Sequence, residues 1–528
     1  MAISVLSVAS EAYPLVKTGG LGDVVGALPA ALAPYGVEVT TFLPGYPRVL
    51  AALEADAAHG KRARTRAWAN AGAQGHKGDE RGPGLLRARE HDGSGEVSHG
   101  LGAPLHRWPD LLGAPAQLLE GEIAGHRLLV LDAPGYFARE GGPYGDPAGR
   151  DWDDNWRRFA AFARAAADVA GGAVGGERYD VLHAHDWQSG LAPAYLRFAP
   201  PAPEAPRTVM TIHNIAFQGR YDASIFASLA LPALAFAVDG VEYYGGVGYL
   251  KAGLESADAI TTVSPTYARE ILSPDFGMGL EGLIRTRQRR VSGIVNGIDT
   301  AVWSPSADPS LPARYDAATL DRRAANKRAV EKAFALDVGD GPIFCVVSRL
   351  TWQKGMDVLA DAIPALVERG ARLALLGSGD AWLEQAFRDA AERFPGQVGV
   401  RLGYDEALSH LLQAGSDAIL IPSRFEPCGL TQLYGLAYGC VPVVARTGGL
   451  ADTVIHANAA ALAAGVATGI QFDTVTYESL VGAIALATDL FADAERWEQI
   501  QRAGMAADFS WATSGRRYAS LYRELLAA

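Results

Sequence analysis

Short runs of β-branched and other apolar residues alternate with longer Ala/Leu-rich segments of helical period along most of the chain. Apolar strands that alternate with helices form parallel sheets covered on both faces, so this pattern predicts a doubly wound α/β fold. The runs that predict strands up to about residue 295 are ISVLSV (3–8), VEVTTFL (37–43), RLLVLD (127–132), DVLHA (180–184), RTVMTI (207–212), DAITTV (258–263) and VSGIV (291–295).

A second series of the same kind begins near residue 340. Its predicted strands are PIFCVVS (342–348), RLALLG (372–377), VGVRLG (398–403), DAILIP (417–422) and VPVVA (441–445), with helices predicted over 356–369 and 381–393. The passage WSPSADPSLPARY, which begins at Trp303, is rich in Pro, Ser and Asp and has the composition of a linker. We therefore predict an N-terminal Rossmann-like domain (1–300), a boundary segment (301–335) and a C-terminal Rossmann-like domain (336–528).

Residues 57–108 depart from this alternation. They show no period and many small or charged residues, as in HGKRARTRAWANAGAQGHKGDERGPG. This composition predicts a long, mobile surface insertion. Its basic residues Lys61, Arg62, Arg64 and Arg66 could bind an anion, although a solvated loop is the favoured interpretation.

Composition narrows the class of protein further. The chain has 528 residues, of which 49% are hydrophobic, which is enough for two cores. A net charge of −12 disfavours nucleic acid or an anionic membrane as the partner. The three cysteines form no CxxC pair, no signal or transit segment is recognisable, and no run of apolar residues is long enough for a transmembrane helix. We therefore expect a cytoplasmic protein.

The stretch KTGGLGD follows the first predicted strand and opens the next helix. Lys17 supplies a positive charge there, while Gly19 and Gly20 would let an anion approach the backbone amides. The order of residues fits neither the GxxxxGK[ST] loop nor GxGxxG, so a tight turn without a ligand is an equal alternative.

Two further stretches in the second half carry groups suited to a sugar phosphate. SRLTWQKG places Arg349 and Lys354 after a strand, where two cations can clamp a diphosphate, with surface salt bridges as the alternative. In PSRFEPCGLTQ, Glu426 could accept hydrogen bonds from sugar hydroxyls, or it could serve as a helix cap. The amides of Gly429, Leu430 and Thr431 open the following helix and could hold phosphate or sugar oxygens, whereas Cys428 is expected to be a buried apolar residue.

Histidines end two strands of the first half. HAHDW contains His183 and His185, and TIHN contains His213 and Asn214. Because no third ligand has a recognisable metal spacing, hydrogen bonding to a hydroxyl is the favoured role and a zinc site is disfavoured. The acidic run DWDD (151–154) could grip Mg²⁺, but it precedes a predicted helix and capping is favoured.

Taken together, these motifs resemble the bacterial glycogen synthase and plant starch synthase family, in order and over almost the whole chain. The motifs are KTGGLGD, GGPYGDPAG, HAHDWQSGLAPAYL, TIHNIAFQG, VSPTYAREI, NGID, SRLTWQKG, PSRFEPCGLTQLYG and TGGLADTV. The resemblance implies two Rossmann-like domains facing across a cleft (GT-B type), with the last helix packing back on the N-terminal domain. It also implies transfer of glucose from ADP-glucose to the non-reducing end of an α-1,4-glucan such as glycogen, with retention of configuration and without a metal or other cofactor.

The resemblance also implies roles for individual residues. Those implied in catalysis are His185, Arg349, Lys354 and Glu426. Those implied in donor binding are Lys17, Gly19, Gly20, Tyr404, Cys428, Gly429, Leu430 and Thr431. Asp23, His213 and Asn214 would lie on the acceptor side. Tyr404 matches the family residue that stacks on adenine, and a partly buried loop aromatic is its alternative.

The chain departs from the family pattern at two places. The insertion at 57–108 is longer than expected, and Tyr434 stands where the Glu-x7-Glu pattern of related transferases has its second carboxylate. Other functions compatible with the same fold are another GT-B-type sugar-nucleotide transferase, a glucan phosphorylase, or a silent glucan-binding regulator. A phosphorylase would need a pyridoxal phosphate lysine, which is not identifiable here.

Overall fold

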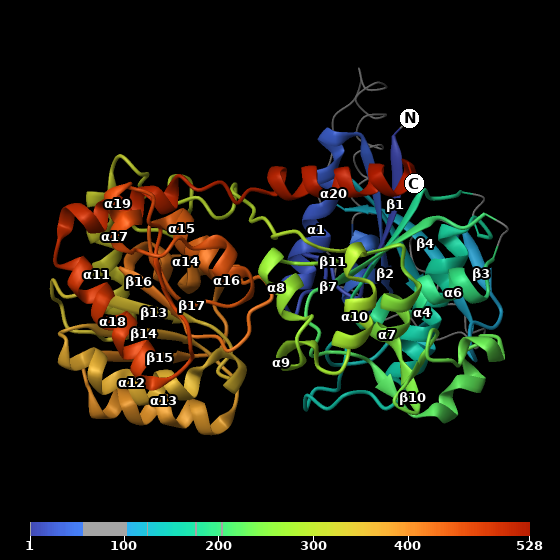
Figure 1. Ribbon diagram of the computed structural model, residues 1–528, viewed down its shortest axis with the longest axis horizontal. Helices are drawn as coiled ribbons and strands as arrows, with labels where there is room; N and C mark the ends of the chain where they lie inside the picture. Colours follow the sequence, from blue (N-terminus) through green and yellow to red (C-terminus); the bar gives the residue numbers. More distant parts are fainter. Residues whose placement is uncertain (1, 56–102, 124, 175–176, 202–203, 528) are drawn as a thin grey trace, which may run out of the picture. The chain divides into compact units, whose positions relative to one another are not determined.

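A computed structural model describes residues 2–55, 103–123, 125–174, 177–201 and 204–527 (Figure 1). The predicted insertion at 57–108, with the basic cluster of Lys61, Arg62, Arg64 and Arg66, lies outside the described residues as far as residue 102. The described chain divides into two compact units. The first comprises Met1–Thr208 and Gln218–Ala257, and the second comprises Val209–Phe217 and Asp258–Ala528.

The larger sheet of the described chain has nine strands, six of which belong to the first unit in the order β6-β1-β2-β5-β4-β3. β1, β2, β5 and β6 are parallel, and β4 and β3 add an antiparallel edge. The bounds are β1 (Ile3–Val8), β2 (Val37–Pro44), β3 (His106–Trp108), β4 (Ala116–Ile123), β5 (His126–Asp132) and β6 (Val181–His185). A small sheet of this unit has the order β8-β10-β9, with β8 (Arg220–Tyr221), β9 (Glu242–Tyr243) and β10 (Gly246–Gly248).

The second unit contains the remaining strands in two groups. β12-β11-β7 are parallel neighbours of the larger sheet, and a six-stranded parallel sheet has the order β15-β14-β13-β16-β17-β18. The bounds are β7 (Arg207–Ile212), β11 (Ala259–Thr262), β12 (Val291–Gly293), β13 (Ile343–Val347), β14 (Arg372–Gly377), β15 (Val398–Leu402), β16 (Ala418–Ile421), β17 (Val441–Ala445) and β18 (Ile470–Phe472).

Helices connect the strands of both units. In the first unit they are α1 (Gly20–Leu32), α3 (Pro134–Phe137), α4 (Asn155–Ala170), α5 (Asp186–Ser189), α6 (Leu191–Phe198) and α7 (Tyr249–Ser256). In the second they are α8 (Pro265–Glu270), α9 (Pro274–Gly277), α10 (Glu281–Thr286), α11 (Arg323–Phe334), α12 (Met356–Glu368), α13 (Ala381–Arg393), α14 (Glu406–Gly415), α15 (Thr431–Tyr438), α16 (Gly448–Thr453), α17 (Ala459–Ala463), α18 (Tyr477–Phe491), α19 (Ala494–Met505) and α20 (Trp511–Ala527). None of the helices in the described ranges combines the length and apolar character needed to cross a bilayer.

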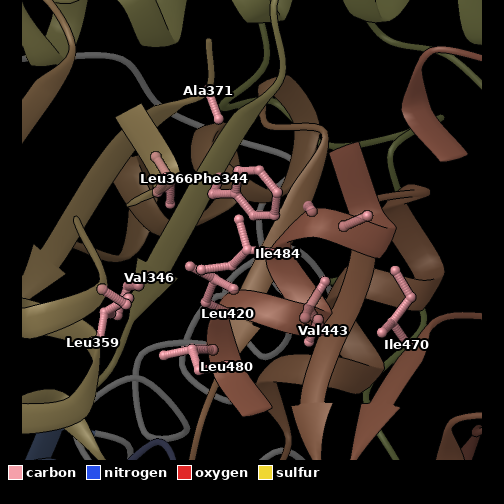
Figure 2. Packing of buried hydrophobic residues seen from close by; sticks show 14 of the residues in the cluster. Phe344, Val346, Leu359, Leu366, Ala371, Leu420, Val443, Ile470, Leu480 and Ile484 are labelled. Atoms are coloured by element: carbon pink, nitrogen blue, oxygen red, sulfur yellow. The ribbon is translucent and has the colours of Figure 1, made fainter. Parts of the chain in front are cut away.

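Alternation along β13 explains why the six-stranded sheet is covered on both faces. Phe344 and Val346 point into a cluster with α12, α13 and α18, whereas Ile343 and Cys345 point into a cluster with α11 and α14. Figure 2 shows the first cluster, in which the side chains of the sheet meet those of α12 and α18. Since successive strand residues face opposite sides, a continuous apolar strand supplies both cores.

In each of the two larger sheets, the order of the strands reverses at one strand, and this strand positions part of the candidate site. β1 has β2, the next strand in the chain, on one side and β6 on the other, and β13 likewise lies between β14 and β16. Loops that leave the carboxyl ends of two such strands diverge, which creates the crevice in which α/β sheets bind ligands. The stretches KTGGLGD, HAHDW, SRLTWQKG and PSRFEPCGLTQ follow β1, β6, β13 and β16.

The strands and helices predicted from the sequence pattern are confirmed, several to the residue. β1, β7, β14 and β17 have the predicted bounds, as does α13. The pattern missed β3, β4 and β18 and the strands β8, β9 and β10 of the small sheet, because all but β4 have only two or three residues and β4 carries charged residues. α20 contacts residues of the predicted N-terminal domain (1–300) that belong to the second unit, since the Thr211 and Thr261 hydroxyls face buried Tyr518 and Ser514 Oγ donates to the Val295 carbonyl at 2.6 Å. The domain boundary at 301–335 stays a prediction.

Candidate functional site

The loop after β1 is built around an ion pair and a buried carboxylate. Lys17 Nζ lies 2.7 Å from Asp23 Oδ1, in the first turn of α1, with both side chains partly exposed. The carboxylate of Glu11, which is 2% exposed, accepts hydrogen bonds from the Thr18 amide at 2.5 Å and from the Gly19 amide at 3.3 Å. Lys17 and Asp23, predicted on the donor and acceptor sides, are therefore direct neighbours. Sequence reasoning missed Glu11, because nothing in the pattern separates it from a surface residue.

Two glycines of this stretch serve different purposes. A Cβ atom on Gly26 would lie 2.4 Å from the Tyr13 carbonyl oxygen, so Gly26 lets α1 pack closely against the preceding loop. A Cβ atom on Gly19 would meet nothing within 4 Å among the described residues, and its φ of −160° is extended backbone that any residue adopts. Packing therefore explains Gly26, whereas the space beside the Cα atom of Gly19 is open, next to the first residue of α1, Gly20.

The histidines that end β6 are buried side by side. The ring centroids of His183 and His185 are 4.1 Å apart, and neither side chain is exposed to solvent. His185 Nε2 lies 3.1 Å from Ser7 Oγ on the neighbouring strand β1. Asp186 follows with a φ of 55°, a left-handed conformation that costs a residue other than glycine roughly 1–3 kcal/mol. Strain of this kind at a strand end is typical of functional sites.

His213 and Asn214 follow β7 in the second unit. Burial lowers the pKa of His213 to about 3, so its imidazole is neutral at physiological pH. Asn214 Oδ1 accepts a hydrogen bond from the Ala216 amide at 3.0 Å, which fixes the turn. A neutral imidazole at a strand end is suited to hydrogen bonding with a hydroxyl.

In the second unit, the structure joins Lys354 to Glu426. Lys354 Nζ lies 2.5 Å from Glu426 Oε2, which also accepts a hydrogen bond from Ser423 Oγ at 2.9 Å. Both side chains of the ion pair are largely buried, with 16% and 11% exposed. Glu426 does not cap α15, whose N-cap residue is Leu430, so the alternative capping role is wrong.

Arg424 holds the two loops that carry this ion pair. Its guanidinium donates to both carboxylate oxygens of Asp357 at 2.7 Å and to the carbonyl of Trp352 at 2.6 Å. The loop after β13 is thereby fixed to the loop after β16, because bidentate pairing restrains both distance and orientation. Sequence reasoning missed Arg424 and Asp357, which lie 67 residues apart in the chain.

The TGGL segment at the start of α16 packs against the backbone of Glu426. The Gly449 amide donates to the Glu426 carbonyl at 3.1 Å, and a Cβ on Gly448, whose φ is 44°, would lie 1.9 Å from the same oxygen. Gln432 Nε2 donates to the carbonyls of Cys428 and Gly429 at 3.0 Å. The conformation of residues 426–431 is therefore fixed by the start of α16 and by the side chain of Gln432.

Arg349 and Tyr404 lie at the surface of the second unit. Within the described ranges, no ion pair to a carboxylate is formed by Arg349, which is exposed at the carboxyl end of β13. Tyr404 follows β15 with 74% of its surface exposed, and its hydroxyl is 3.3 Å from Glu406 Oε2. The alternative interpretation of Tyr404 as a partly buried aromatic is thus wrong.

Cys428 is buried, as predicted for an apolar residue. Burial raises the pKa of its thiol to about 12, although N–H groups of Asn296 oppose the shift. Gly429, with a φ of 70°, turns the chain into the first turn of α15, where Leu430 and Thr431 lie. Cys428 therefore contributes shape to this loop rather than a nucleophile.

Tyr434 stands where the Glu-x7-Glu pattern of related transferases has its second carboxylate, and in this structure it packs against another aromatic ring. Its ring stacks on Trp303 with centroids 3.6 Å apart, and the other face of Trp303 stacks on His410 at 3.9 Å. An acidic residue at this position would lose the stacking contact.

The acidic run before α4 does not act as a side-chain cap. Asp154 is the N-cap residue, but its carboxylate binds Arg139 at 2.5 and 2.6 Å and makes no capping hydrogen bond, so the capping interpretation is wrong in that respect. Arg139 holds the pKa of Asp154 below its usual value despite partial burial. The described residues contain no group of three or more His, Cys, Asp or Glu that could hold a metal.

Comparisons with known proteins agree with this geometry. Residues 4–76 and 87–286 match the starch synthase catalytic domain, and residues 328–503 match glycosyl transferases group 1. A glycogen synthase from Novosphingobium aromaticivorans is 61% identical to the chain, covering 100% of it and 99% of the relative. One from Rhizobium tropici is 54% identical, covering 99% of each.

Solved structures share the fold. The catalytic domain of starch synthase IV from Arabidopsis thaliana, bound to ADP and acarbose, has a TM-score of 0.80 at 29% identity, with both chains fully covered. A sucrose-phosphate synthase from Thermosynechococcus elongatus, 17% identical with 99% of each chain covered, has a TM-score of 0.55 and supports the fold alone. Two Rossmann-like sheets with sites at their strand-order reversals define a GT-B glycosyltransferase. The chain belongs to the glycogen synthase and starch synthase family, which confirms the predicted family and fold.

The contrast between the two glycines can be tested by thermal unfolding. We expect Gly26→Ala to lower the free energy of unfolding by roughly 1–3 kcal/mol, because the new methyl group collides with the Tyr13 backbone. Gly19→Ala should change it by less than about 0.5 kcal/mol, because nothing is displaced. An equal loss in both variants would show that Gly19 also has a packing role.

The raised thiol pKa predicts that Cys428 is inert. At pH 8 a thiol with a pKa of about 12 is ionised in roughly one molecule in ten thousand, and only the thiolate attacks disulfide reagents. We expect none of the three buried cysteines to react with Ellman's reagent in the native protein, and all three to react in guanidinium chloride. Rapid reaction of one thiol under native conditions would contradict this assignment.

Proposed function

We propose that the chain transfers glucose from ADP-glucose to the non-reducing end of an α-1,4-glucan such as glycogen, with retention of configuration. The observation that carries the proposal is the arrangement at the carboxyl ends of β13 and β16. There, the buried pair of Lys354 and Glu426 is held by Arg424, and Arg349 is exposed without a carboxylate partner in the described chain. A cationic site with an acceptor-only carboxylate is suited to a sugar diphosphate.

The relatives support this choice of substrates. Proteins more than half identical to the chain over their full length are named glycogen synthases, and the Arabidopsis starch synthase structure contains ADP and acarbose. A preference for ADP-glucose over UDP-glucose rests on this likeness, because the exposed ring of Tyr404 would stack on either base. A cytoplasmic location stays a prediction from the composition.

In the proposed mechanism, the leaving diphosphate gains negative charge while the anomeric carbon of glucose becomes positive. Arg349 and Lys354 would stabilise the departing phosphates, and cations that are already oriented act most strongly where charge grows in the transition state. Glu426 would accept hydrogen bonds from the glucosyl unit, as would His185, and the amides of Gly429, Leu430 and Thr431 would hold the distal phosphate. Attack from the face of the leaving group accounts for retention without a protein nucleophile.

Lys17 and the amide of Gly20 would contribute to donor binding from the first unit. The amide of Gly19, predicted for the same role, donates to Glu11 in this structure and would have to leave that carboxylate to bind a phosphate. Asp23, His213 and Asn214 would serve the acceptor. Lys17 pairs with Asp23 in this structure, so a phosphate that binds Lys17 has to compete with that carboxylate. The proposal needs no metal ion or other cofactor.

A direct assay tests the proposed activity. Transfer of labelled glucose to glycogen should proceed with ADP-glucose in the presence of EDTA, and more slowly with UDP-glucose. Lack of transfer from either donor would refute the function, and a strict requirement for a divalent metal would redirect attention to Asp151–Asp154.

Removal of the Lys354 charge should reduce turnover strongly. We expect Lys354→Ala to lower kcat by at least about a hundredfold, which corresponds to roughly 3 kcal/mol of transition-state stabilisation. Lys327→Ala is a matched control, because Lys327 forms a similarly buried pair with Asp417 at 2.8 Å, away from these loops. The control should lose stability but keep its kcat. Turnover close to wild type in Lys354→Ala would refute the role.

A further inference from the structure

Glu11 forms an unusually complete set of hydrogen bonds for a buried carboxylate. Oε2 accepts from the amides of Thr18 and Gly19, and Oε1 accepts from Thr18 Oγ1 at 2.6 Å and from the Tyr144 hydroxyl at 2.5 Å. Thr18 is therefore held twice, once through its backbone and once through its side chain. Because the residue before it is Lys17, the same contacts set the direction in which Lys17 leaves the loop.

Tyr144 supports the far side of this carboxylate. Its hydroxyl also lies 2.8 Å from Ser10 Oγ, and its carbonyl accepts from Asn155 Nδ2 at 2.8 Å. Asn155 Oδ1 in turn accepts from Arg158, a fully buried guanidinium that also donates to the carbonyl of Pro143. Burial and the neighbouring Glu11 charge raise the pKa of Tyr144, so its hydroxyl remains a donor at any physiological pH.

The loop that presents Tyr144 is the GGPYGDPAG motif, to which sequence analysis assigned no role. Asp146 braces this loop by accepting from the amides of Ala148 and Arg150 at 2.9 and 3.0 Å. A Cβ on Gly145 would lie 2.6 Å from the Arg150 carbonyl oxygen, so the loop closes tightly on itself. The motif thus supplies a rigid support for Tyr144.

An ionised carboxylate suits this environment best. Four donors converge on two oxygens, and an ionised carboxylate is the side chain that accepts through both without donating. A glutamine of the same size carries no charge and has only one oxygen, so its N–H group would face two of these donors, and the Thr18 and Tyr144 hydroxyls could meet it only by turning from donor to acceptor. Hydrogen bonds to a charged group contribute more to stability than those between neutral groups, so loss of the charge would weaken every contact that holds the Lys17 turn.

We propose that Glu11, supported by Tyr144, is a positioning residue that holds the Lys17–Gly20 turn in the conformation required for donor binding. The inference rests on the proposed function, in that Lys17 and the Gly20 amide are taken to meet the donor phosphates. Glu11 itself touches no substrate. Glu11 accepts hydrogen bonds from the Thr18 and Gly19 amides and thereby fixes the backbone of the turn. The charge of Lys17 and the open space beside Gly19 then stay in one arrangement.

The test measures ADP binding by calorimetry in wild type, Glu11→Gln, Lys17→Ala and the double variant. We expect Glu11→Gln to weaken ADP binding at least tenfold and to raise the KM for ADP-glucose by a similar factor, with the KM for glycogen within twofold of wild type. In the Lys17→Ala background, Glu11→Gln should weaken ADP binding by less than twofold, because the group that it positions is already gone.

The outcomes separate this proposal from the proposed function. Equal weakening by Glu11→Gln with and without Lys17, or no weakening at all, would overturn the positioning role while leaving donor binding by Lys17 intact. Unchanged ADP binding in Lys17→Ala would overturn the donor role of Lys17 and this proposal together. Asp168→Asn is the matched control, since it alters a buried carboxylate of the same unit that binds Arg164 and Trp108. It should lower the melting temperature and leave ADP binding unchanged.

A milder pair of variants covers the case in which Glu11→Gln does not fold. Thr18→Val removes only the hydroxyl that donates to Oε1, whereas Thr18→Ser keeps it. We expect Thr18→Val to weaken ADP binding about threefold to tenfold and Thr18→Ser to bind as wild type. Indistinguishable binding by the two variants would overturn the proposal.

Discussion

The placement of β16 beside β13 is the constraint on which the second half of the candidate site depends. The chain places β14 and β15 on one side of β13 before it returns to the other side. This reversal brings together loops 72 residues apart in sequence, so that Lys354 and Glu426 form a largely buried ion pair. A buried ion pair is stable only where its geometry is fixed, and the bidentate contact between Arg424 and Asp357 supplies that rigidity.

Carboxylates organise the cationic groups of both units. Asp23 pairs with Lys17 and Glu426 pairs with Lys354, so that each lysine is held in a defined position by an internal anion. Glu11 plays the corresponding part for backbone amides, because it accepts the hydrogen bonds of Thr18 and Gly19. Under the proposed function, a diphosphate that binds Lys354 exchanges one set of charge-assisted hydrogen bonds for another. Internal partners of this kind keep the donors oriented while limiting the reorganisation that binding requires.

Prediction from the sequence succeeded for strands whose structure follows from the pattern of neighbouring residues. The apolar strands β1, β7, β14 and β17 were predicted to the residue, because a strand buried on both faces has few alternatives to a continuous apolar run. It failed for β4, the strand next to the sheet edge, whose charged residues break that pattern, and for the favoured capping role of Asp154. For Asp154, and for Glu426, where capping was the alternative, a distant cation, Arg139 or Lys354, competes successfully with the nearby helix terminus.

The sequence alone determined the class of fold, the family and the stretches that carry the candidate site, because periodicity and motif order are local properties. It did not determine which groups hold the glycine-rich turn after β1. The groups that hold it are Glu11 and Tyr144. They lie 133 residues apart in the chain and meet only because the fold places the GGPYGDPAG loop beside the residues that follow β1. Hydrogen bonds of this kind depend on positions and directions in space, and a carboxylate has no local signature that distinguishes a solvated side chain from a buried acceptor of four donors.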